Sequence, residues 1–298
     1  MASRLIINAD DFGLTLGVNR AIAELHQAHV LTSTTLMATG AAFDDAVAIA
    51  RANPSLGVGC HVVLTDGKPV SPPDSIPSLL GADGKNFRPS LLDFMQALMR
   101  GNIREEEIER EALAQVQKLQ RAGIAVTHLD THKHTHLFPA VASPLLRVAQ
   151  RCSIGAIRNP FEPAWSSRLA PNAFVRRLQF HILSMLGKRS FELLPQLNDG
   201  HVLTAAGTIG VSATGQLDAA SLRKILHAMP EGTWELVCHP GYNDAALRAI
   251  TTRLRATREI ERDTLLQEIP QAIRTVSGLE LIHYGEIGPN RSDHERTL

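Results

Sequence analysis

Short apolar runs alternate along the chain with segments in which apolar residues recur at helical spacing. The run Leu5–Ala9 is typical of a buried strand, and Val18, Ile22 and Leu25 then recur as one face of a helix does. Further strands are predicted at residues 33–37, 56–63, 125–130, 156–158, 234–238 and 279–284. Strands that alternate with helices in this way predict an α/β fold, a single irregular (β/α) barrel over residues 1–298.

Two segments interrupt the alternation. Residues 64–90 carry five prolines and are too long for an ordinary connection, so we expect a rim loop over the site. Residues 161–198 read as a helical insertion, in which 165–195 combine an apolar face with basic flanks. That combination fits a helix that contacts a membrane surface, and equally a helix packed on the barrel or in a homodimer contact.

Composition excludes some classes of partner and compartment. Lysine plus arginine number 30, as do aspartate plus glutamate, and aromatic residues make up 4% of the chain, so nothing favours a nucleic-acid partner. Three widely spaced cysteines indicate a reducing compartment without disulfides. The start of the chain lacks the pattern of a signal peptide, and no apolar run is long enough to span a bilayer. We therefore expect a cytoplasmic protein, with peripheral contact to the inner membrane as the alternative.

Two adjacent acids stand where the first strand ends, in Asn8-Ala9-Asp10-Asp11-Phe12-Gly13. Burying an unpaired carboxylate costs several kcal/mol, so a buried pair implies a cation, a shared proton, or both. A simpler explanation is that Asp11 or Thr15 caps the following helix. Capping accounts for one acid and leaves the other unexplained.

Histidines gather at the ends of other predicted strands. His61 ends the third strand, and His239 ends a later one just before a Pro-Gly turn. The segment Thr127–His136 carries four of the thirteen histidines, and the alternation of a strand places His128, Asp130 and His132 on one face while the strand lasts. A lone histidine is more often hydrogen-bonded in a core than a ligand, but a cluster at strand ends is a strong local signal. The remaining histidines of the run, His134 and His136, can orient ligands, shuttle protons or bind substrate.

One carboxylate and two imidazoles leave open positions on a divalent ion, which fits a hydrolytic site and equally a non-haem iron site. The additional aspartate favours hydrolysis. Asp11 can hold the metal while Asp10 takes the proton of the attacking water, and His239 can protonate a leaving amine. An iron oxygenase needs no such acid–base pair, so it remains the alternative.

These motifs, with Cys238-His239-Pro240-Gly241, resemble the YdjC-like carbohydrate deacetylase family, in register from residue 4 to about residue 287. The resemblance implies a barrel of the deacetylase type with one divalent metal ion. Zinc or magnesium is favoured over manganese or cobalt. It implies Asp11, His61 and His128 as metal ligands and Asp10 as base, with His239 as general acid and His132 as the alternative acid. The implied reaction removes the N-acetyl group of an amino sugar and releases acetate.

Within that family the chain looks most like the hopanoid-biosynthesis-associated branch, in residues 61–70, the His-Lys-His run and residues 158–163. That branch is expected to deacetylate an N-acetylglucosaminyl group on a hopanoid lipid. The part after Tyr242 looks closer to soluble chitooligosaccharide deacetylases, which makes a soluble diacetylchitooligosaccharide the alternative substrate. Arg158 is a candidate substrate contact because its guanidinium suits sugar hydroxyls or an acid near the metal. Asp130, His132 and His134 are expected to bind substrate or to orient ligands. A sugar-binding protein that keeps the site without activity is a further alternative.

Overall fold

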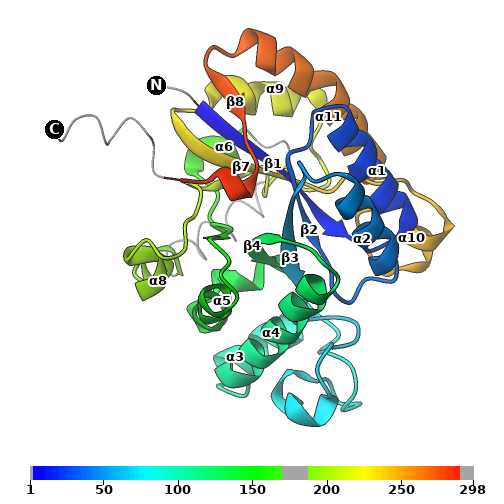
Figure 1. The fold of residues 1–298 in the computed structure, drawn as a ribbon, viewed down its shortest axis with the longest axis vertical. Helices are drawn as coiled ribbons and strands as arrows, with labels where there is room; N and C mark the ends of the chain where they lie inside the picture. Colours follow the sequence, from blue (N-terminus) through cyan, green and yellow to red (C-terminus); the bar gives the residue numbers. More distant parts are fainter. Residues whose placement is uncertain (1–2, 170–186, 289–298) are drawn as a thin grey trace.

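The computed structural model describes residues 3–169 and 187–288. In these ranges eight parallel strands form one sheet in the order β5-β4-β3-β2-β1-β7-β6, with β8 paired to the first residues of β1. The sheet curls into a half-barrel with helices around it (Figure 1), which confirms the predicted α/β barrel class. The strands are β1 (Ser3–Phe12), β2 (Ser33–Leu36), β3 (Gly57–Val62), β4 (Val126–Thr131), β5 (Ala156–Ile157), β6 (Thr208–Ile209), β7 (Gly232–Cys238) and β8 (Leu279–Leu281).

Several helices begin at a residue whose side chain caps them. The Thr15 hydroxyl accepts the N–H of Val18 at the start of α1, so Asp11 is not needed as a cap. Ser90 caps α3 by accepting the N–H of Asp93, and Asp218 caps α9 by accepting the N–H of Ser221. The helices are α1 (Leu16–Gln27), α2 (Phe43–Ala52), α3 (Leu91–Met99), α4 (Glu105–Arg121), α5 (Pro139–Arg151), α6 (Ala164–Ser167), α8 (Pro195–Asn198), α9 (Ala219–Ala228), α10 (Ala245–Ala249) and α11 (Ala256–Thr275).

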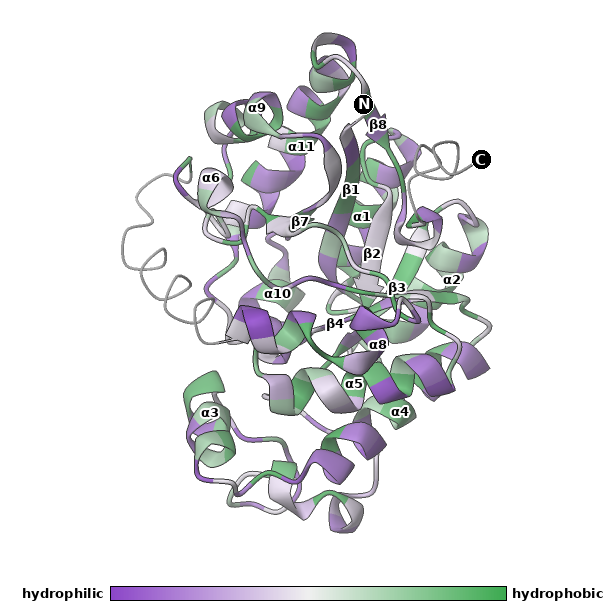
Figure 2. Ribbon diagram, turned by 90° about the vertical axis from the view of Figure 1, so that its left-hand side faces the viewer, coloured by the Kyte–Doolittle hydropathy of each residue, from purple (hydrophilic) through white to green (hydrophobic). Residues whose placement is uncertain are grey.

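The strands have two different faces. Leu5, Ile7 and Ala9 of β1 belong to the main apolar core, together with buried residues of the surrounding helices. Ile6 belongs to a second, small apolar cluster with Ala156, Ile282 and Tyr284. Period two places Asn8 and Asp10 on the Ile6 side, so the inner face of the half-barrel is polar toward the carboxyl end of β1. Figure 2 shows that the outer helices carry both hydrophilic and hydrophobic residues, as amphipathic helices do.

The gap between the edge strands β5 and β6 is bridged without regular strand pairing. The N–H of Ile157 donates to the Leu203 carbonyl at 2.9 Å, and the Asn159 amide donates to the Ala205 carbonyl at 3.2 Å. The Thr208 hydroxyl donates a hydrogen bond of 2.6 Å to the Asn159 carbonyl. These bonds make the barrel irregular and fix the segment that carries Arg158.

The proline-rich segment 64–90 is held from behind by acids of α4. The buried Glu111 carboxylate accepts the backbone N–H groups of Val70 and Ser71, both at 2.9 Å, and Glu107 accepts a third from the same segment. Because these carboxylates are buried, the loop lacks the freedom of a solvent-exposed connection. The rim loop is therefore tied to the scaffold.

The predicted insertion at 161–198 is described only in part. It contains α6 and α8, and residues 170–186 lie outside the described ranges. The expectation of membrane contact through 165–195 therefore rests mostly on residues that the structure does not describe. Among the described helices, none has both the length and the apolarity needed to cross a membrane.

We expect Glu111→Ala to free the rim loop. The change leaves two backbone N–H groups without an acceptor, which lowers the free energy of unfolding by about 2–4 kcal/mol. Urea unfolding measures the loss of stability, and trypsin cleavage after the exposed Lys85 reports on the freedom of the loop. Glu106→Ala, at an exposed position of the same helix, is the control and should behave as wild type. Equal cleavage in the two variants would contradict the role of Glu111.

Candidate metal centre

A bulge at the end of β1 brings the two adjacent acids to one place. Consecutive residues of a regular strand point to opposite faces. Here the pairing of β1 with β2 shifts register between Ala9 and Phe12, and Asp11 has φ +67°. The Asp10 and Asp11 side chains are both buried, and both contact groups of the inner polar network.

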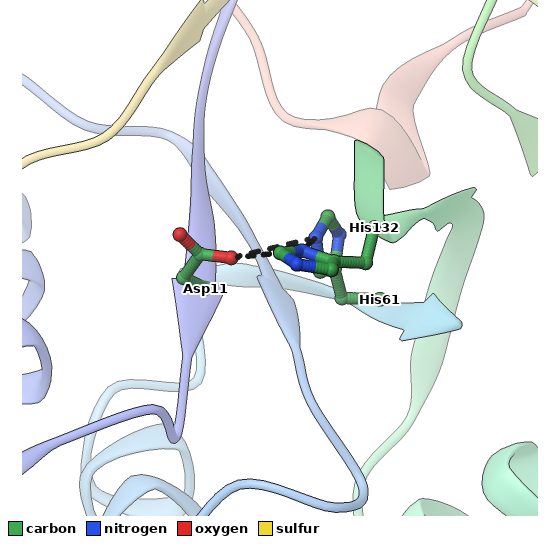
Figure 3. A group of neighbouring side chains, drawn as sticks. All are labelled: Asp11, His61 and His132. Carbon is green, nitrogen blue, oxygen red and sulfur yellow. Dashed lines mark hydrogen bonds and ion pairs between the residues drawn. The ribbon is translucent and has the colours of Figure 1, made fainter. Parts of the chain in front are cut away.

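Three side chains form a triangle of donor atoms at the carboxyl ends of the strands (Figure 3). Asp11 Oδ1 lies 3.6 Å from His61 Nε2 and 3.4 Å from His132 Nδ1, and the two ring nitrogens are 3.3 Å apart. Ligands at about 2.1 Å from a tetrahedral ion lie about 3.4 Å from one another. The donor set and its spacing therefore fit one divalent cation, and His132, which is about one quarter exposed, lies on its accessible side.

His61 is oriented by the carboxylate beside it. Its Nδ1 lies 2.7 Å from Asp130 Oδ1, which leaves Nε2 for the triangle. Burial lowers the pKa of His61, but the carboxylates of Asp130, Asp10 and Asp11 outweigh burial and raise this pKa to about 9. Without a metal, His61 is thus an imidazolium at neutral pH.

His128, which the sequence suggested as a ligand, lies apart from the triangle. The pairing of β3 with β4 sets His61 level with Asp130, so His128 lies two residues further from the strand ends, about 6.6 Å. Its ring stacks on Tyr284 at 3.8 Å between centroids, and its Nε2 lies 3.2 Å from Asn8 Oδ1. Burial, helped by Arg158, holds the pKa of His128 well below its usual value. The ring is neutral and packs within the barrel.

Gly59 makes room for that ring. A Cβ atom at Gly59 would lie 2.5 Å from His128 Cε1, closer than real contacts allow. The inner face of β3 therefore needs glycine at this position, and His128 is fixed between β3 and Tyr284.

Arg158 is fully buried among three carboxylates. Its Nη1 lies 2.9 Å from Asp10 Oδ2 and 2.6 Å from Asp130 Oδ2. Its Nη2 donates to Asp10 Oδ1 and to Glu235 Oε1, both at 2.6 Å. The guanidinium that we expected to contact substrate is instead engaged with acids of β1, β4 and β7.

Asp10 is ionised because of this contact. Burial would raise the pKa of Asp10, but the Arg158 guanidinium, with His61 and His239, holds this pKa well below its usual range. Asp10, His61 and Asp130 also lie close enough to form a second candidate metal group. Both carboxylates of that group already pair with Arg158, so the triangle of Asp11, His61 and His132 is the better site.

His239 lies beside Asp10, as expected for an acid–base pair. Its Nε2 is 3.7 Å from Asp10 Oδ2, and its backbone N–H donates to Glu261 Oε2 at 2.6 Å. The ring Nδ1 is buried and has no hydrogen-bond partner within the described ranges, with the nearest carboxylate oxygen, of Glu261, at 3.9 Å.

The later histidines of the run do not join the triangle. They lie in a short 3₁₀ segment, His132–Leu137, in which Lys133 and His134 have positive φ. Burial, with help from Arg158, lowers the pKa of His134 to about 3. His136 bonds Thr131 Oγ1 at 2.6 Å, and burial holds its pKa well below the usual value. Both rings are neutral at physiological pH.

The charges of the buried site do not balance within the protein. Asp10, Asp11, Asp130 and Glu235 supply four carboxylates, and Arg158 and Arg258 supply two guanidiniums. When all four acids are ionised, two negative charges remain. The His61 imidazolium offsets one of them in the metal-free protein, and a divalent cation bound to neutral His61 would offset both.

A family model described as YdjC-like protein matches residues 4–274 of the chain. The chain belongs to the YdjC-like family.

Individual relatives agree with this assignment. A protein of Geobacillus stearothermophilus named "Carbohydrate deacetylase" is 30% identical over 287 residues, covering 94% of this chain and 96% of the relative. A protein of Brevibacillus brevis with the same name is 42% identical over 158 residues, which span 53% of this chain and 60% of that protein. The crystal structure of a putative cellobiose-phosphate cleavage protein from Enterococcus faecalis V583 has a TM-score of 0.77 and 27% identity, covering 95% of this chain and 98% of the other.

The structure of this YdjC-like chain adds site residues that the sequence reasoning missed. Glu235 accepts the hydroxyl of Tyr284 and lies in the otherwise apolar end of β7. Period two places Glu235 on the same face as His239, so its position could have been predicted. Arg258, whose Nη2 lies 2.5 Å from Asp11 Oδ2, carries no such signal in the sequence.

We expect Asp130→Asn to lower the pKa of His61, because the Asp130 carboxylate is the strongest of the groups that raise it. In the metal-free wild type, the raised pKa stabilises the fold below about pH 6.5, and this contribution is lost as the pH rises through about 9. The free energy of unfolding should therefore fall more steeply over this range in wild type than in the variant. Histidine NMR titration and urea unfolding measure both effects. Asp66→Asn, at an exposed acid, is the control. An unchanged pKa of His61 in Asp130→Asn would refute the role of Asp130 in raising that pKa.

Proposed function

We propose that this YdjC-like protein is a metal-dependent carbohydrate deacetylase, which hydrolyses the N-acetyl group of an amino sugar and releases acetate. One observation carries the proposal: the triangle of Asp11, His61 and His132 lies beside an ionised Asp10 that neighbours His239. The relatives named carbohydrate deacetylase support a hydrolase of this class. The acid–base pair has no use in an iron oxygenase, so hydrolysis is favoured over that alternative.

We propose Asp11, His61 and His132 as the metal ligands, with His132 in the place that the sequence suggested for His128. Two imidazoles and a carboxylate favour zinc, while magnesium prefers oxygen ligands; manganese and cobalt also tolerate this set. When bound, the ion lowers the pKa of a water molecule and polarises the acetyl carbonyl. His132 is then engaged as a ligand, which leaves His239 as the general acid.

Asp10 and His239 supply the proton transfers in this proposal. Asp10, kept ionised by Arg158, accepts a proton from the attacking water. A carboxylate with a lowered pKa retains that proton poorly, and His239 Nε2, 3.7 Å away, is placed to take it on. His239 then protonates the amine nitrogen as the C–N bond breaks. The products are acetate and the free amino sugar.

For the substrate we propose an N-acetylglucosamine-type sugar carried on a hopanoid lipid. The proposal rests on the resemblance of residues 61–70 and 158–163 to the hopanoid-associated branch. It includes peripheral membrane contact through 165–195, whereas a homodimer contact is the other use of that segment. The resemblance of the part after Tyr242 to soluble enzymes makes a diacetylchitooligosaccharide the competing substrate.

Acetate release from N-acetylglucosaminyl hopanoid and from diacetylchitobiose, measured side by side, tests the proposal. We expect release that EDTA abolishes and added zinc restores. Faster release from the hopanoid supports the lipid substrate, and faster release from the disaccharide assigns the enzyme to soluble sugars. No acetate from either substrate under these conditions would contradict the proposed function.

In the same assay, Asp10→Asn should lower kcat by about 10²–10⁴-fold, because the proton acceptor for the attacking water is lost. Zinc binding, measured by calorimetry, should persist, since Asp10 lies outside the triangle. Asp199→Asn, at an exposed acid outside the site, is the matched control for an Asp-to-Asn change and should keep full activity. An Asp10 variant with wild-type turnover would rule out the mechanism.

Alanine variants of His132 and His128 should differ in opposite ways in zinc affinity and in stability. His132→Ala removes a ligand and should weaken zinc binding at least 100-fold with little loss of stability, because its side chain is partly exposed. His128→Ala should bind zinc within a few-fold of wild type but unfold more easily, by about 2–4 kcal/mol, because it empties a buried, stacked site. Calorimetric zinc titration and urea unfolding measure both. The opposite pattern would restore His128 as the ligand.

A further inference from the structure

We propose that Arg258, on the first turn of α11, is a positioning residue that holds Asp11 in the geometry needed for metal binding. The inference rests on the proposed metal site and concerns a residue outside every motif of the chain that suggested chemistry.

The two oxygens of the Asp11 carboxylate have different surroundings. Oδ2 accepts Arg258 Nη2 at 2.5 Å, while Oδ1 faces His61 and His132. Asp10, by contrast, has both oxygens bound by Arg158. A single contact on Oδ2 fixes the rotation of the Asp11 carboxylate and leaves one oxygen free for an ion.

Asp11 needs such a fixed partner because of its backbone. Its φ of +67° lies in the left-handed region, which a non-glycine residue occupies only when its surroundings hold it there. Arg258 is itself fixed, since it is almost fully buried and its Nε donates to the Leu254 carbonyl at 3.1 Å. The contact therefore fixes the position of the proposed metal ligand Asp11 relative to helix α11.

The absence of a side chain at Gly241 makes room for the Arg258 side chain. A Cβ atom at Gly241 would lie 3.0 Å from Arg258 Cδ and 3.1 Å from Val18 Cγ2, tighter than ordinary contact. The glycine of the Pro-Gly turn after His239 thus leaves space for the Arg258 side chain to reach from α11 to Asp11 at the end of β1. Helix α11 lies beside α1 on the outside of the sheet (Figure 1).

The same turn of α11 holds the other half of the site. Glu261, three residues after Arg258, accepts the backbone N–H of His239 at 2.6 Å and that of Gly215 at 3.0 Å. One helix turn therefore fixes Asp11 through Arg258 and the His239 segment through Glu261. This arrangement sets the distance between the metal ligand and the acid–base pair.

Arg258→Met tests the inference, with zinc titrated by calorimetry into the full-length, metal-free protein. Loss of the contact should weaken zinc binding about 10–100-fold, the usual effect of removing a group that orients a ligand. Saturating zinc should return kcat to within a few-fold of wild type, because the defect lies in holding the ligand. Arg223→Met is the matched control. Arg223 is an exposed residue of α9 that makes a two-bond ion pair to Glu268 of α11 and contacts none of the site residues, so its loss should leave zinc affinity unchanged.

Zinc affinity in Arg258→Met equal to wild type, or tighter, would overturn the inference, since a tighter site would mean that Arg258 only repels the cation. Should Arg258→Met fail to fold, Arg258→Lys decides. Lysine keeps the buried charge but cannot bond Asp11 and Leu254 together, so we expect a smaller loss of at least threefold, and an unchanged affinity refutes the role. A wild-type protein that binds no divalent ion would refute the proposed metal site itself, and the inference with it.

Discussion

The Arg158 guanidinium is the group on which the interior of the half-barrel depends. It is fully buried, and it joins acids that arrive from β1, β4 and β7. Desolvating three carboxylates and a guanidinium costs several kcal/mol per ion, which only close mutual pairing offsets. The curl of the sheet and the ion cluster therefore require each other: the strands bring the acids to one cation, and that cation allows acids to line the inner face.

The division of work between the adjacent acids follows from which arginine each one meets. Arg158 takes both oxygens of Asp10, which keeps Asp10 ionised but lowers its basicity. Arg258 takes one oxygen of Asp11 and leaves the other beside His61 and His132. Sequence adjacency alone would make the two residues equivalent. In the proposed mechanism, these environments make Asp10 a proton acceptor that must pass its proton on and Asp11 a metal ligand.

Sequence patterns predicted the parts of this structure that local periodicity controls. The alternation of strands and helices and the gathering of His61, Asp130 and His239 inside the barrel both follow from it. Choosing between His128 and His132 as the third side chain of the triangle requires the register of β3 against β4. The alternation of a strand tells which face a residue lies on, but not how far along the strand it lies relative to the neighbouring strand. Helix α11 was missed because it buries charged and polar residues, among them Arg258, Glu261 and Glu268, and contains Pro270, so no one-sided apolar stripe marks it.

The rim loop shows how such a site can remain fixed while its substrate changes. One contact joins the loop to the histidine run, an ion pair of 3.6 Å between Asp66 and Lys133, and its partners are exposed enough that it contributes at most about 1 kcal/mol. The buried bonds from Glu107 and Glu111 reach the loop from the opposite side, through α4. Because the loop is held from behind, residues such as Asp66 that face the histidine run can change without disturbing the fold of the loop or the metal ligands. That face and the ion cluster of the inner face are therefore held by separate sets of bonds.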